Sequence, residues 1–452
     1  MAGLSVAHKV ALAAIVERAP DTMLATLIHV VGSLPGDRAR ELQTMLAEEV
    51  LDRRRRATVL LPLLPMFRRR ADDIECMTFP SAVLPRLWKA ASSREPELLP
   101  RLDEEGPDVM PVVNRICVAA ASAVRDQPDL VWPVGLEPAA REKGLDDLAA
   151  CLDLAPLARK GLPSLEIWLK RPDGDQIAEL RLLLKDCAAV HQDGSWRVLE
   201  ILFSHLEDAV LILRIVTQTS GVAERESFLS ASELADFIQR LIVGVEVRAA
   251  RIAAFQSGAT KVTVEDIIAD FSWCAGVLGE LDITLTLSPQ SAWGKSVRDG
   301  RVMISGQLSS FLRAADKAVD KALPLAKVKI GGRMSRKCPL LTAPVEGPDV
   351  NSVRNLLKLV GSVRSAASVF GAESNRKTLV EALTTRLSDY AEEALHMVND
   401  GEVEDEAHAL KLIDLASYCL ALIDAKDAAR TVRRRAAVAG ADKDDKASSR
   451  AA

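Results

Sequence analysis

The chain has 452 residues, of which 48% are hydrophobic, 27% charged and 4% aromatic, a composition typical of a globular protein of about three domains. The formal net charge of −5 excludes an overall electric field that would attract nucleic acid. The shortage of aromatic residues disfavours β-sandwiches and barrels, so the expected fold class is predominantly all-α.

Residues 1–125 are predicted to form short helices packed as helical hairpins, because prolines recur throughout this region. The apolar stretch 10–16 is short and runs into Glu17 and Arg18, which favours an amphipathic helix over a signal peptide. No uncharged run reaches the roughly 18 residues that a membrane-spanning helix needs. We therefore expect a soluble, cytoplasmic protein.

Seven arginines bracket an apolar run in residues 52–73, DRRRRATVLLPLLPMFRRRADD. Acidic residues lie four positions from four of these arginines, in the pairs Glu49–Arg53, Asp52–Arg56, Arg68–Asp72 and Arg69–Asp73. The positive charge is therefore largely neutralised within the stretch. Pro62 and Pro65 each remove a backbone donor, which predicts two charged helices joined by a buried turn.

This stretch gives two hypotheses about binding. If the apolar side chains are exposed, they are the best candidates for contact with a partner protein: Leu60, Leu61, Leu63, Leu64, Met66 and Phe67. The flanking arginines are candidates for binding an anion, either nucleic acid or an anionic membrane surface: Arg53, Arg54, Arg55, Arg56, Arg68, Arg69 and Arg70.

The central region, 139–280, is expected to be helical and to follow a domain boundary at the proline-rich connector 126–138. The segment from Glu200 to Thr219 is apolar on most faces, which predicts one buried core helix. Thr263 and Asp266 have the spacing of a capping box, which predicts that a helix begins there.

Residues 281–348 form a mixed connector in which a small β element is expected near 283–330. The alternation in 283–287 is typical of a strand, and 301–305 and 327–330 are weaker candidates, with a helix at about 307–322 between them. The segment KIGGRMSRK (329–337) combines two glycines with four cations and is either an anion-binding turn or a solvated connector.

The triplet Gly294-Lys295-Ser296 resembles the end of a phosphate-binding loop, in which the lysine and the hydroxyl hold phosphate and magnesium. Pro289 stands where that motif has its first glycine, and it removes a backbone N–H that would face the phosphates. Lys295 and Ser296 are therefore candidates for a nucleotide site, with an ordinary surface loop as the alternative.

Residues 349–437 are predicted to form an antiparallel helical bundle. Apolar residues recur there at spacings of three and four in three segments, separated by the short breaks GAESN and NDGEVED. The remaining residues, 438–452, are small and polar, which predicts a disordered tail.

The sequence AHALK in this bundle resembles the histidine phosphotransfer modules, in which an exposed helical histidine accepts a phosphoryl group. The matching positions are His408, Leu410 and Lys411, and the resemblance implies that Lys411 would stabilise the phosphoryl charge. Leu412 replaces the glycine of that pattern. A solvent-facing histidine on a helix is the alternative interpretation.

Motifs for metal binding and catalysis are missing from the sequence. The seven cysteines include no CxxC pair, the six histidines include no pair at i+3 or i+4, and neither G-x-S-x-G nor HExxH occurs. We therefore expect reduced cysteines, no metal and no cofactor, and favour a protein that is not an enzyme.

The leading functional hypothesis is a helical adaptor, scaffold or regulator that binds another protein, with self-association as one form of that binding. The first alternative is a nucleotide- or phosphoryl-dependent signalling protein that uses Lys295 and Ser296, or His408 and Lys411. The second is a binder of nucleic acid or an anionic membrane surface through the arginine clusters, although the net charge argues against nucleic acid.

Overall fold

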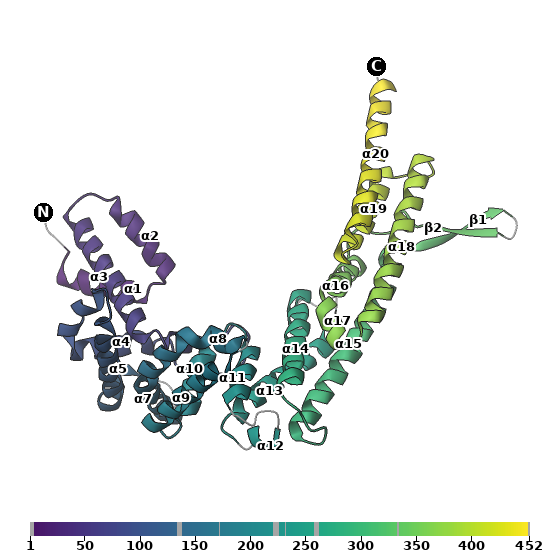
Figure 1. Ribbon diagram of the computed structural model, residues 1–452. Coiled ribbons are helices and arrows are strands. Elements are labelled where there is room, and N and C mark those ends of the chain that lie inside the picture. Colours follow the sequence, from purple (N-terminus) through teal and green to yellow (C-terminus); the bar gives the residue numbers. More distant parts are fainter. Residues whose placement is uncertain are drawn as a thin grey trace. The chain divides into compact units, whose positions relative to one another are not determined.

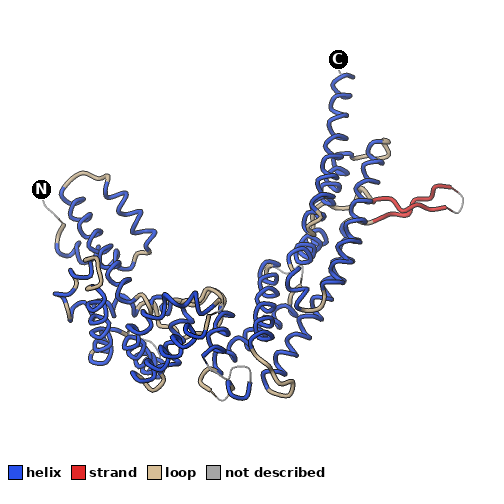
Figure 2. Tube along the Cα trace, viewed as in Figure 1, coloured by secondary structure: helices blue, strands red, loops and turns tan. Residues whose placement is uncertain are grey.

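The computed structural model describes residues 4–132, 138–170, 172–219, 226–230, 232–256, 262–331 and 334–450. Helices dominate these residues, and the strands form a single two-stranded hairpin, which confirms the predominantly all-α fold class (Figure 2). The chain forms two compact units, Met1–Ala223 with Ala231–Leu234, and Glu224–Ser230 with Ala235–Ala452. None of the described helices combines the length and the apolar character that a membrane span requires.

The first unit consists of α-helices and short 3-10 helices (Figure 1). Its α-helices are α1 (Val6–Arg18), α2 (Asp21–Gly32), α3 (Asp37–Leu60), α4 (Val83–Arg94), α5 (Val109–Asp126), α6 (Pro128–Val131), α7 (Pro138–Gly161), α8 (Leu165–Leu169), α9 (Gly174–Val190), α10 (Gly194–Ser204) and α11 (Ile212–Thr219). Its 3-10 helices are η1 (Leu64–Phe67), η2 (Pro96–Leu98), η3 (Pro100–Asp103), η4 (Leu162–Ser164) and η5 (Ala209–Leu211).

The first unit is held together around α5, which contacts both α4 and α7. The side chains of Val113, Ile116 and Ala120 on α5 are fully buried. Because of these contacts, residues on both sides of the proline-rich connector lie in the same unit. Residues 133–137 of that connector lie outside the described residues.

The apolar run after the first arginine cluster folds as a turn, as the two prolines predict. Helix α3 ends at Leu60, η1 follows, and the Nε2 atom of His205 lies 2.9 Å from the carbonyl oxygen of Pro62. The predicted second charged helix is wrong, because residues 68–82 contain no helix. The guanidinium of Arg70 instead donates to the carbonyls of Phe203 and Leu206, at 2.8 and 2.9 Å.

The prediction of one core helix from Glu200 to Thr219 is also wrong, although most of this segment is buried as expected. Helix α10 ends at Ser204, and η5 and α11 follow after a short break. The break forms because the Asp208 carboxylate accepts a hydrogen bond from the Val210 amide at 3.0 Å and starts a new helical segment.

The second unit contains the remaining helices and the hairpin. Its helices are α12 (Glu226–Leu229), α13 (Ala235–Ala254), α14 (Val264–Thr284), α15 (Ala292–Ala322), α16 (Pro348–Ser362), α17 (Arg364–Val369), α18 (Glu373–Asn399), α19 (Glu406–Leu422) and α20 (Lys426–Arg450). Its strands are β1 (Leu325–Gly331) and β2 (Met334–Pro339), which pair antiparallel.

An aromatic core joins the helices at the start of this unit. The ring of Phe271 on α14 lies 6.2 Å from Phe311 and 6.5 Å from Phe370, in both cases edge to face. The predicted capping box is confirmed at the N-terminus of α14, where Thr263 and Asp266 bond reciprocally. Helices α16 to α20 form the predicted bundle, in which α19 contacts α16, α18 and α20. The backbone of α20 continues to Arg450, through residues whose composition predicts disorder.

The strand predictions are corrected at two of their three positions. The segment 327–330 lies in β1 as expected, but 301–305 lies inside α15. The segment 283–287 begins in the last residues of α14 and then contains only an isolated bridge. Helix α15 starts fifteen residues earlier than the predicted 307 because Ser291 caps it by accepting from the Gly294 amide at 2.9 Å.

Candidate functional site

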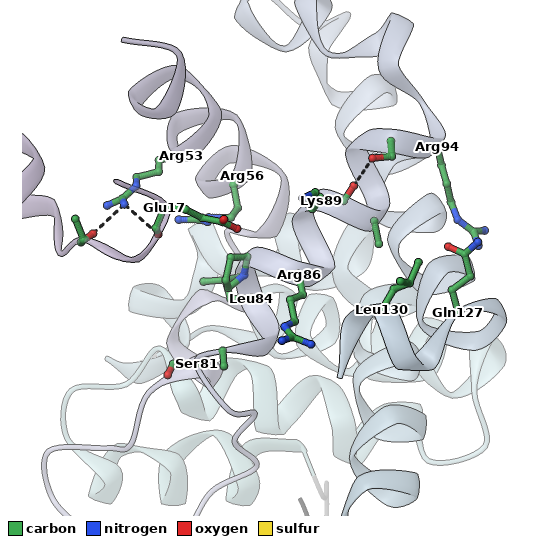
Figure 3. Close-up of a pocket in the computed structure, with 15 residues that line it drawn as sticks. Glu17, Arg53, Arg56, Ser81, Leu84, Arg86, Lys89, Arg94, Gln127 and Leu130 are labelled. Carbon is green, nitrogen blue, oxygen red and sulfur yellow. Dashed lines mark hydrogen bonds between the residues drawn. The ribbon is translucent and has the colours of Figure 1, made fainter. Parts of the chain in front are cut away.

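A groove of about 1240 Å³ in the first unit is the best-formed candidate site (Figure 3). Its walls are the C-terminal end of α1, the C-terminal part of α3, the length of α4, and the end of α5 with α6. Positive side chains predominate among its charged lining residues: Arg53, Arg56, Arg86, Lys89 and Arg94, with Glu17 as the acidic residue.

Helix α4 turns two of these cations toward the groove. The apolar side chains of Val83, Leu87 and Trp88 are buried on one face of the helix. Arg86 and Lys89 are three residues apart and therefore share another face, where both side chains are exposed. The amphipathic pattern of α4 thus creates a cationic wall.

Arg53 forms the groove wall and is fully engaged within the protein (Figure 3). Its guanidinium donates to the carbonyls of Val16 and Ala19, at 2.9 and 2.8 Å, where α1 ends. It also pairs with Glu49 at 2.7 Å, which confirms the predicted i, i+4 pair, and with Asp21 at the start of α2. Arg53 therefore holds α1 and α2 against α3.

Three cations of the groove remain available to a ligand. Arg94 pairs with Asp126 at 2.9 Å, whereas no described carboxylate lies within ion-pair distance of Arg56, Arg86 or Lys89. Arg56 is half-buried, and burial together with the neighbouring Arg53 charge lowers the pKa of its guanidinium from the ordinary value. Arginine still stays protonated at neutral pH, so an anion at Arg56 would neutralise a partly desolvated charge.

The groove also has an apolar part. Leu84, Pro85 and Ala90 of α4 line it, together with Leu130 of α6, which is 61% exposed. Its volume exceeds the roughly 300–1,000 Å³ of a typical small-molecule pocket. An elongated ligand that carries both apolar and negative groups fits this surface best.

The other arginines of the two clusters divide into structural and exposed side chains. Arg55 pairs with Asp103 of η3, and Arg70 pairs with Asp72 at 2.7 Å. Arg54, Arg68 and Arg69 are exposed and do not line the groove. Of the seven arginines proposed as anion-binding residues, Arg53 and Arg56 line the groove. Of these two, Arg53 pairs with Asp21 and Glu49, whereas no described carboxylate lies within ion-pair distance of Arg56.

Most of the predicted partner-binding run is buried in the first unit. Leu60, Leu63, Met66 and Phe67 are 0–5% exposed, and the ring of Phe67 lies 5.6 Å from that of Phe79. Leu64 is half-buried, and Leu61 is 48% exposed. The run therefore supplies core contacts, and Leu61 is its one strongly exposed apolar side chain.

The residues of the predicted nucleotide site lie in the first turns of α15 rather than in a loop after a strand. Lys295 is exposed and Ser296 is half-buried. A side chain at Gly294 would meet the carbonyl oxygen of Ser288 at 1.9 Å, so this glycine permits close packing of the helix start. No backbone loop is formed here to enclose phosphates.

His408 and Lys411 lie in the first turns of α19. The backbone amide of His408 donates to the capping carboxylate of Asp405 at 2.9 Å. Its ring atom Nε2 lies 2.8 Å from the carbonyl oxygen of Ala343, so the imidazole is half-buried and engaged with the preceding linker. Lys411 is exposed. This placement favours a structural role for the histidine over phosphoryl transfer.

Arg86 and Lys89 are the site residues that the sequence analysis missed. Their signal is the spacing in VLPRLWKAASSR, where cations at i and i+3 stand opposite buried apolar residues. That spacing alone could not show that α1, α3 and α6 leave a groove beside this face, because those walls come from distant parts of the chain.

Comparisons of the chain with protein-family models, with curated proteins and with solved structures gave no match. Within the described ranges, no group of three or more His, Cys, Asp or Glu side chains could hold a metal ion.

Proposed function

We propose that the protein is a helical scaffold or adaptor whose first unit binds an acidic, partly apolar segment of another protein. The observation that carries this proposal is the groove lined by Arg56, Arg86 and Lys89, for which no described carboxylate is within ion-pair distance. Complementary charge across an interface favours the correct partner and speeds its association.

The apolar surroundings of the groove support a protein as the ligand. Leu84, Pro85 and Leu130 line the groove. Outside its lining, large apolar side chains are exposed on α1 and α2: Ile15 is 58% exposed, Met23 is 53% exposed and Ile28 is 41% exposed. Exposed apolar surface of this kind is typical of protein-binding sites. A partner segment with acidic and apolar residues would satisfy both kinds of surface.

Nucleic acid is the less favoured ligand for this groove. Its lining includes no aromatic side chain on which an unpaired base could stack. Two of the four arginines of the neighbouring cluster, Arg53 and Arg55, are already paired with carboxylates. A peptide can place carboxylates against the three cations and apolar side chains against the apolar wall. A nucleic acid has a continuous phosphate backbone, which suits this mixed surface less well.

Fluorescence anisotropy with the full-length protein tests this proposal. The probe is a labelled peptide of Glu-Ala-Leu repeats, compared with a peptide of Gln-Ala-Leu repeats of the same length. We expect the acidic peptide to bind more tightly, and the double variant Arg86→Glu/Lys89→Glu to weaken it by about tenfold or more, because two like charges would then face the ligand.

A matched variant controls for the change in net charge. Arg101→Glu/Lys160→Glu makes the same charge change at exposed residues of the first unit that do not line the groove. Binding of the acidic peptide should be almost unchanged in this variant. Equal binding of the two peptides by the wild-type protein, or equal losses in the two double variants, would contradict the proposal.

A further inference from the structure

The β-hairpin of the second unit carries an unusual concentration of positive charge. Its sequence from Leu325 to Pro339 contains five basic residues, Lys327, Lys329, Arg333, Arg336 and Lys337. No acidic residue occurs between Asp320 and Glu346. The hairpin is therefore a basic segment in a chain whose net charge is negative.

The pairing of the strands places like charges opposite each other. Lys327 lies directly across the ribbon from Lys337, and both side chains are exposed. Side chains at such positions have Cβ atoms about 5 Å apart, and like charges there destabilise the pairing. No described carboxylate is within ion-pair distance of either lysine, whereas Arg336 pairs with Glu393. An anionic ligand would relieve this repulsion.

The hairpin is held firmly at its base and extends from α18 (Figure 1). Strand β2 contacts α18, Cys338 is buried, and the Leu340 amide donates to the Pro324 carbonyl at 2.9 Å. No third strand pairs with the ribbon within the described part of the chain. An isolated two-stranded ribbon is only marginally stable in water. The contacts at its base therefore stabilise the hairpin while its charged strands extend into solvent.

We propose that this hairpin is an arm that binds the phosphate backbone of double-stranded nucleic acid. The major groove of B-DNA, about 12 Å wide, admits a two-stranded β-ribbon. The basic residues follow both strands along the length of the ribbon, which suits a groove with phosphates on both sides. This inference is independent of the peptide-binding groove in the first unit.

Salt-dependent binding of the full-length protein to DNA tests the arm. The probe is a labelled duplex of about 24 base pairs, and its binding is measured by anisotropy at about 50 to 300 mM NaCl. Each phosphate that the protein neutralises contributes about 0.9 to the slope of the logarithm of the binding constant against the logarithm of the salt concentration. We expect Lys327→Gln/Lys337→Gln to reduce the magnitude of the wild-type slope by about 1.8, and either single substitution by about 0.9.

The matched control is Lys317→Gln/Lys377→Gln, which removes the same charge from exposed lysines on α15 and α18. Its slope should equal that of the wild type. Removing the repulsion between Lys327 and Lys337 should leave the hairpin at least as stable, so loss of folding does not obscure the result. Absence of duplex binding at about 50 mM salt, equal slopes in both double variants, or binding only to phosphatidylserine vesicles would overturn the proposal.

Discussion

Individual arginines in this protein hold distant chain segments together through backbone carbonyls. Arg70 is the clearest case, because its guanidinium stacks on the ring of Phe203, 4.5 Å from the ring centroid, and donates to two carbonyls at the C-terminal end of α10. The Asp72 carboxylate orients this guanidinium and also accepts from the Ala209 amide at 3.2 Å. The Arg70–Asp72 pair therefore joins residues more than 130 positions apart.

Asp72 should give the protein a stability that depends on pH. Burial opposes its ionisation, but the Arg70 guanidinium and the amides of Ile74 and Ala209 outweigh burial and lower the pKa of Asp72. The resulting stabilisation is fully present above the unfolded-state pKa of about 4 and is lost as pH falls through the lower folded-state pKa. We expect Asp72→Asn to be less stable than wild type at pH 7, and the difference to shrink below about pH 4. Urea denaturation across this range measures it, and a constant difference would contradict it.

The residue contacts that could be predicted from sequence are the local ones. Glu49 with Arg53 and Thr263 with Asp266 lie within one helical turn, so their spacing alone identifies them. The partners of Arg70 could not be predicted, because the carbonyls that it meets are exposed only where α10 ends. The groove could not be predicted for the same reason, because contacts between distant segments form it. Arg56 was a candidate from sequence, but Arg86 and Lys89, which line the groove with it, come from another helix.

At the scale of elements, the helical class was predicted correctly, but two helices, the start of α15 and two of the three strands were not. The segment 301–305 is a weaker strand candidate with a short apolar run, but the Ser291 cap and the apolar positions Val297, Ile304 and Leu308 extend α15 through it. A short apolar run cannot distinguish the two structures by its period alone. The strand at 327–330 pairs with β2, which in turn contacts α18.

Glycine at the contact between α16 and α19 should be essential for packing of the bundle. A Cβ atom at Gly361 would lie 2.0 Å from the carbonyl oxygen of Leu422, which is backbone and cannot rotate away. Gly361→Ala should therefore lower the free energy of unfolding by about 2 kcal/mol or more. Gly306→Ala in α15 is the control, because it has nothing within 4 Å and should gain about 0.5–1 kcal/mol from helix propensity. Chemical denaturation of both variants checks this, and equal effects would contradict it.

At the scale of the whole molecule, the two compact units should unfold separately, as multidomain chains commonly do. Each unit contains a charged contact whose removal should destabilise that unit. In the first, Arg159 donates to the carbonyls of Thr58 and Val59, at 3.1 and 2.6 Å. In the second, Asp270 is 2% exposed and bonds Arg251 at 2.5 Å.

We expect calorimetry to show two transitions that respond to different substitutions. Arg159→Leu should lower only one melting temperature, because it removes about 2 kcal/mol of charged hydrogen bonding from the first unit. Asp270→Ala should lower only the other, because it removes the buried carboxylate that pairs with Arg248 and Arg251 in the second unit, at a cost of about 3 kcal/mol or more. A single transition that both substitutions shift equally would contradict the division into independent units.

The assignment of residues 224–234 to the two units limits where an expression fragment of the C-terminal half can begin. Residues Glu224–Ser230 belong to the second unit, although Ala231–Leu234 belong to the first. Helix α12 within that short segment supplies the buried side chain of Leu229, and the Glu226 carboxylate accepts from the Ser288 amide at 2.7 Å. A truncation that begins at Ala235 would delete both residues and leave that amide without its acceptor. An expression fragment for the C-terminal half must therefore begin upstream of Glu226, and it then includes Ala231–Leu234, which belong to the first unit.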